Sequence, residues 1–176
     1  METKEQRLKR LKNNRPAEAL LTMVQSLWNM FVEPEIKPAC EHNMVCLLLL
    51  GIHAVAKIWS EILFNDKSVK GFKRYLELYV DGDADNQKFS RIADKLNDKR
   101  NIIAHQWLSC QGHEFGFNSK MNEGWRIENG ITFINPRIYF DCFYENFPTW
   151  DDIRVRFSET EIEQMKERII KMYTRK

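Results

Sequence analysis

The sequence predicts a mainly α-helical bundle of four to five helices, with a small β-hairpin inserted before the C-terminal helix. Apolar residues recur at steps of three and four over most of the chain, which is the spacing of one helix face. The 176 residues include only seven Gly and five Pro, and this scarcity favours long regular elements. Asn129-Gly130, between two short apolar runs, is the strongest short signal for a hairpin. The length fits a single domain, residues 1–176.

The first half of the chain is expected to be helical. Residues 1–15 form a basic N-terminal arm, with a short exposed helix over 4–13. Pro16 suits the first position of a second helix, which the two prolines of VEPEIKP should end. The segment from about Cys40 to Phe64 is apolar almost all round, so we expect it to be the central helix of the bundle.

The second half is expected to combine helices with the hairpin. Helices are predicted from about Val69 to Val80 and over roughly 86–109. Residues 113–157 form a β-hairpin and irregular elaboration, in which 137–150 are ambiguous between strand and irregular packing. The capping box Ser158-Glu-Thr-Glu161 then opens a final helix to about Met172.

Composition narrows the class of protein. The formal net charge of +2 is too small to indicate nucleic-acid binding by bulk charge. The four cysteines form no CxxC pair, which indicates reduced thiols and a cytoplasmic location. The histidines and cysteines show no zinc-ligand spacing, so we expect neither metal nor cofactor. The apolar run that starts at Met44 is shorter than a membrane span and contains a histidine, so we expect a buried helix and no membrane contact.

Arg100, Asn101 and His105 of the predicted 86–109 helix are candidates for a functional site. On a helical wheel Arg100 falls between Leu96 and Ile103, near the middle of the apolar stripe, where a charge needs a partner or a ligand. Asn101 and His105 are four residues apart and share a neighbouring face of the helix.

These residue types suit chemistry on phosphodiesters. Histidine titrates near neutrality, so it can take a proton from a ribose 2′-hydroxyl or give one to a leaving 5′-oxygen. Arginine offers a fixed fork of donors to a phosphate. Asparagine can hold the imidazole tautomer or donate to a phosphate oxygen. Together Arg100, Asn101 and His105 suffice for metal-free RNA cleavage, and Lys99 is a candidate contact to the RNA backbone.

The pattern Arg100-Asn101-Ile-Ile-Ala-His105 resembles the signature of the HEPN superfamily, as does its late position among helices. The resemblance implies a helical bundle, a homodimer whose two motifs share a cleft, and metal-independent endoribonuclease activity in bacterial defence or toxin–antitoxin systems, with a cognate antitoxin as partner. It makes Arg100 and His105 catalytic and Asn101 supporting. Trp107 departs from the family, because one branch has there a tyrosine that antitoxins modify.

Other interpretations of the same residues remain open. A HEPN-like domain can bind RNA or nucleotides, or serve for dimerisation, without cleaving. A purely structural helical domain can also carry solvated or paired polar groups at these positions. His53, on the apolar central helix, is predicted to be a core histidine rather than a ligand.

Overall fold

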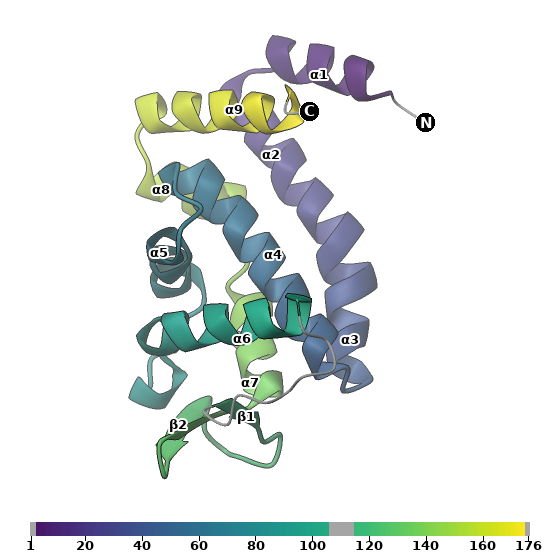
Figure 1. Ribbon diagram of the computed structural model, residues 1–176. Helices are drawn as coiled ribbons and strands as arrows, with labels where there is room; N and C mark the ends of the chain where they lie inside the picture. The colour runs from purple at the N-terminus through teal and green to yellow at the C-terminus, as the bar shows by residue number, and fades with distance from the viewer. Residues whose placement is uncertain (1–2, 106–114, 175–176) are drawn as a thin grey trace.

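The structure, a computed structural model, describes residues 3–105 and 115–174. It confirms a mainly α-helical fold with a small β insertion (Figure 1). Predicted features within 106–114, including Trp107, lie outside the described residues. In chain order the elements are α1 (Lys4–Asn13), α2 (Pro16–Leu27), the π-helix η1 (Trp28–Ile36), α3 (Lys37–Glu41), α4 (Val45–Phe64), α5 (Val69–Tyr79), the 3₁₀ turns η2 (Asp85–Gln87) and η3 (Phe89–Ile92), α6 (Ala93–His105), β1 (Phe115–Phe117), β2 (Trp125–Glu128), β3 (Ile131–Ile134), α7 (Pro136–Glu145), α8 (Trp150–Arg156) and α9 (Glu159–Thr174).

Helix α4 is the centre of the bundle, as predicted. It packs against α5, α6, α7, α9, η1 and α3 (Figure 1). Ile52, Ala56, Trp59 and Ile62 on this helix have no exposed surface. By length and composition α4 could cross a membrane, but 56% of its most apolar window is buried inside the protein. In this structure α4 packs as a core helix.

The predicted break at VEPEIKP is wrong, because the chain stays helical from α2 to α3. Pro34 lies inside the π-helix η1. In an α-helix the proline ring clashes with the carbonyl four residues earlier, and the wider π turn relieves this clash. The N–H of Lys37 accordingly bonds to the carbonyl of Val32, five residues back. Pro38 falls in the first turn of α3, where proline is tolerated.

Two asparagines bound the central helix. Asn43 adopts a left-handed conformation (φ 54°) between α3 and α4. This turn moves the start of α4 from the predicted Cys40 to Val45. Asn65, also left-handed, ends α4 directly after Phe64, as expected. Asparagine tolerates this conformation better than most residues, which makes it a frequent helix stop.

The connection between α4 and α5 is a tight turn. The Ser68 N–H donates to Asp66 Oδ1 at 2.8 Å, and Ser68 Oγ caps α5 by accepting from the Lys70 N–H at 3.1 Å. Gly71 allows the turn to lie against α5, because a Cβ there would stand 2.2 Å from the Asp66 carbonyl oxygen. The 65–68 turn is therefore held in place at both of its ends.

The hairpin is confirmed at Asn129-Gly130. Both residues have positive φ, 51° and 79°, as a two-residue type I′ turn requires. Strands β2 and β3 pair antiparallel through this turn. The short strand β1, which the sequence did not indicate, pairs parallel with β3 on its other side, giving the order β1-β3-β2.

The 137–150 region, ambiguous in sequence, is mostly helical. Asn135 caps α7 by accepting from the Arg137 and Ile138 N–H groups, and Pro136 is the first residue of α7. Thr149 begins α8 with a capping box. The predicted capping box of the last helix is confirmed: the Ser158 N–H donates to Glu161 Oε2 at 2.8 Å, and the Glu161 N–H donates to Ser158 Oγ.

Candidate functional site

Helix α6, which carries the motif, packs across α4 (Figure 1). It begins at Ala93 rather than at the predicted 86, because residues 85–92 form two 3₁₀ turns. The Asp81 carboxylate fixes this entry by accepting from both the N–H and the hydroxyl of Ser90. Helix α6 is described as far as His105.

A pocket of about 630 Å³ lies between α4, α6 and the 65–68 turn. Its lining mixes apolar and polar side chains and includes three cationic side chains and one carboxylate. The lining residues are His53, Lys57, Ile58, Glu61, Lys67, Ser68, Val69, Asn97, Arg100 and Asn101. The pocket therefore has the charge balance of an anion-binding site.

Arg100 reaches this pocket from the apolar stripe of α6. Leu96 and Ile103 on either side of it are buried, at 2% and 4% exposure, as the wheel predicted. The Arg100 Nη1 donates to Asn101 Oδ1 at 3.1 Å, whereas its Nε is buried without a hydrogen-bond partner. No ion pair with a carboxylate of the described chain is found for this guanidinium. A buried donor of this kind is costly unless a ligand satisfies it.

Lys57 faces the same pocket from α4. Its Nζ donates to the Lys67 carbonyl oxygen at 2.7 Å, which ties the side chain to the 65–68 turn. Burial lowers the pKa of Lys57, and the nearby Arg100 charge lowers it further. The carboxylate of Glu61 forms an ion pair with Lys67 at 2.9 Å. Lys57 and Arg100 therefore place two like charges at the same pocket, and their repulsion is unfavourable.

His53 lies one helical turn before Lys57 and is 4% exposed. Its ring packs on Phe72 with centroids 4.2 Å apart, and its Nε2 is buried without a hydrogen-bond partner. Burial lowers its pKa to about 3, with smaller contributions from Lys57 and Arg100, while a hydrogen bond with Asn97 acts in the opposite direction. The imidazole is therefore neutral near pH 7. The prediction of a core histidine is confirmed in its burial, but His53 also lines the pocket.

The structure places the four predicted site residues differently. Arg100 and Asn101 meet in the pocket. His105 is the last described residue of α6, four residues after Asn101, and its side chain lies outside the described part of the chain. Lys99 does not line the pocket: it is 6% exposed, and its Nζ lies 5.7 Å from the centroid of the Phe117 ring. This burial favours a structural role for Lys99 over contact with RNA.

Sequence reasoning missed Lys57 and Asn97. The spacing in the sequence was the available signal. His53 and Lys57 are four residues apart on the predicted central helix, and Asn97 and Asn101 are four residues apart on the predicted 86–109 helix, so each pair shares a helix face. What the sequence lacked was the pairing of α4 with α6 that brings the two faces together.

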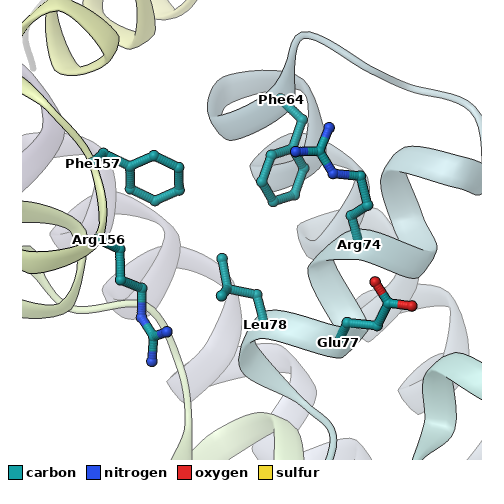
Figure 2. A pocket seen from close by; sticks show the side chains of 6 residues that line it. All are labelled: Phe64, Arg74, Glu77, Leu78, Arg156 and Phe157. Atoms are coloured by element: carbon teal, nitrogen blue, oxygen red, sulfur yellow. The ribbon is translucent and has the colours of Figure 1, made fainter.

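A second hollow of about 450 Å³ lies between α5 and the ends of α4 and α8. Figure 2 shows Phe64 and Phe157 on opposite sides of it. The Arg74 guanidinium stacks 4.1 Å from the centroid of the Phe64 ring. Arg74, Glu77 and Arg156 are exposed, and none of the described buried polar atoms without a partner belongs to this lining. The pocket between α4 and α6 is therefore the stronger candidate.

Within residues 3–105 and 115–174, no group of three or more His, Cys, Asp or Glu side chains is placed to hold a metal ion. Comparisons with protein-family models, with curated proteins and with solved structures found no match. The resemblance to the HEPN superfamily therefore depends on the motif and its helical setting.

His53 predicts a pH dependence of stability. Its folded-state pKa of about 3 lies below the ordinary 6.5, so between these values the unfolded chain binds a proton that the folded chain does not. The free energy of unfolding should therefore fall as the pH drops through this window, by up to about 1.4 kcal/mol per pH unit. Urea unfolding of wild type and His53→Gln over this range measures the effect. We expect wild type to lose its advantage as the pH falls, and parallel curves would contradict the burial of a neutral imidazole.

Proposed function

We propose that this protein is a metal-independent endoribonuclease of the HEPN type, which binds an RNA phosphate against Arg100 in the pocket between α4 and α6. One observation carries the proposal: the Arg100 guanidinium lies on an otherwise apolar helix stripe, lines a pocket with Lys57, and has a buried Nε without a partner. A desolvated guanidinium fork is suited to a phosphate oxygen.

The proposed reaction is attack of the ribose 2′-oxygen on the adjacent phosphorus. The bond from phosphorus to the 5′-oxygen breaks, which leaves a 2′,3′-cyclic phosphate and a 5′-hydroxyl. His105 acts as the general base for the 2′-hydroxyl or as the general acid for the leaving oxygen. Arg100 stabilises the charge that develops on the phosphate, and Asn101 orients the neighbouring groups. In the structure Asn101 Oδ1 accepts from Arg100, so this amide orients the guanidinium.

The second candidate is a HEPN-like module that binds RNA or nucleotides without cleaving. A specific observation favours it: His53, the described imidazole of the pocket, is neutral near pH 7 and has a pKa of about 3. Proton transfer at neutral pH therefore depends on His105. If His105 does not reach the phosphate, the same pocket binds and does not cut.

We further propose a homodimer that works in the cytoplasm as part of a bacterial defence or toxin–antitoxin system, with a cognate antitoxin as partner. The resemblance to the HEPN superfamily supports the defence or toxin–antitoxin role, and a set of exposed apolar residues supports the dimer. Of the seven large hydrophobic residues exposed in the described chain, five lie between residues 21 and 47, on α2, η1 and the entry to α4: Leu21, Met30, Phe31, Met44 and Leu47. Exposed large apolar side chains concentrated in one segment of the chain are candidates for a contact between two copies of the protein.

Cleavage is tested with purified protein and RNA in excess chelator, with analysis of the product ends. We expect 2′,3′-cyclic phosphate ends, and we expect His105→Ala to lower the rate by about 10²-fold or more, the usual contribution of a general acid or base. Arg100→Ala should lower the rate while leaving the unfolding midpoint near that of wild type. Lys73→Ala, an exposed position on α5, is the control.

Two outcomes overturn this assignment. If His105→Ala cleaves as fast as wild type, His105 does not transfer the proton. If Arg100→Ala unfolds instead of losing activity alone, the arginine belongs to a structural domain.

The dimer is tested by sedimentation equilibrium. We expect wild type to sediment as a dimer and Leu47→Glu to shift toward monomer, because a buried unpaired carboxylate opposes association. Lys73→Glu is the control, since it adds a carboxylate on another helix. A wild-type protein that stays monomeric at high concentration contradicts the shared cleft.

A further inference from the structure

We propose that α4 supplies half of an oxyanion site, in which the Lys57 ammonium and the His53 Nε2 bind, together with Arg100, one phosphate group between α4 and α6. The proposal deepens the proposed function, because the motif on α6 accounts only for the arginine. It adds two binding residues that lie more than forty positions earlier in the chain.

The first support is a pair of buried nitrogen atoms on one pocket. His53 Nε2 and Arg100 Nε are both buried without a hydrogen-bond partner, and both residues line the pocket. Buried polar atoms in folded proteins are almost always hydrogen-bonded, and two of the six exceptions among the described side chains belong to residues of this pocket, one on α4 and one on α6. An oxyanion explains both, since the N–H of a guanidinium and the N–H of a neutral imidazole each donate to oxygen.

The second support is the placement of Lys57. Its ammonium has three donors, and the Lys67 carbonyl takes one of them at 2.7 Å. The remaining donors belong to a side chain whose position the 65–68 turn fixes. Asp66, Ser68 and Gly71 shape this turn. Lys57 is thus held at the pocket before a ligand arrives, which lowers the entropy cost of binding.

The third support is electrostatic. Burial and the Arg100 charge both disfavour the protonated form of Lys57, so its pKa is lowered. Burial is the main reason that the pKa of His53 is lowered, and the charges of Lys57 and Arg100 lower it further. A phosphate between Lys57 and Arg100 would reverse this repulsion, because each cation gains an opposite charge in a partly buried site. Lys57, Arg100 and His53 therefore favour a compact anion whose oxygen atoms can accept hydrogen bonds from more than one of them.

The test measures binding without cleavage. The probes are inorganic phosphate and thymidylyl-(3′,5′)-thymidine, a phosphodiester that lacks the attacking 2′-hydroxyl. Each is titrated at constant ionic strength into wild type, Lys57→Met, His53→Gln and the matched control Lys73→Met. Binding is followed by calorimetry, and the His53 ring nitrogens are followed by NMR in the wild-type protein, a reading that needs no variant to fold.

We expect both probes to shift the His53 nitrogen signals. Lys57→Met should weaken binding about tenfold or more, because it removes a charge-assisted hydrogen bond to the probe, and His53→Gln should weaken it severalfold. Lys73→Met should bind within about twofold of wild type, because Lys73 lies outside the pocket. If the protein binds both probes but cuts no RNA, the phosphate site proposed here stands and the proposed endoribonuclease activity is wrong. The proposal is overturned if neither probe moves the His53 signals at saturation, or if Lys57→Met and Lys73→Met bind alike.

Discussion

The charge of Arg100 on an apolar helix face is the constraint on which the site depends. Burying an unpaired guanidinium costs far more than a folded protein can spare, so the residue must reach water, a carboxylate or a ligand. Here it reaches a pocket of about 630 Å³, together with Lys57. Two cations at one opening are unfavourable for folding alone, and such arrangements are more common where a site binds an anion.

The fold builds this arrangement from two helices that pack against each other. Lys57 and His53 lie on α4, the buried centre of the bundle, and Arg100 lies on α6, which packs across it. A left-handed Asn65 and a closely packed Gly71 hold the connecting turn against α5. Side chains on well-packed helices keep their positions better than side chains on loops, so the pocket exists without a bound partner.

Local signals in the sequence predicted the local features. Asn129-Gly130 located the hairpin, Ser158 and Glu161 located the last helix, and the wheel singled out Arg100 as a charge among buried residues. The missed features depend on longer-range or unusual geometry. The helix through Pro34 needs a π turn that propensity alone does not foresee. Helix α7 had a capping signal at Asn135-Pro136, but its dense aromatic residues also suit a strand. The contribution of α4 to the site follows only from tertiary packing, which no spacing rule supplies.

The most direct measurement is a crystal structure of the protein with the non-cleavable dinucleotide bound. We predict phosphate oxygens within about 2.7–3.2 Å of Arg100 Nε and Lys57 Nζ, in the pocket between α4 and α6. A dinucleotide bound elsewhere, with the Arg100 guanidinium satisfied by a carboxylate of the protein itself, would contradict this prediction.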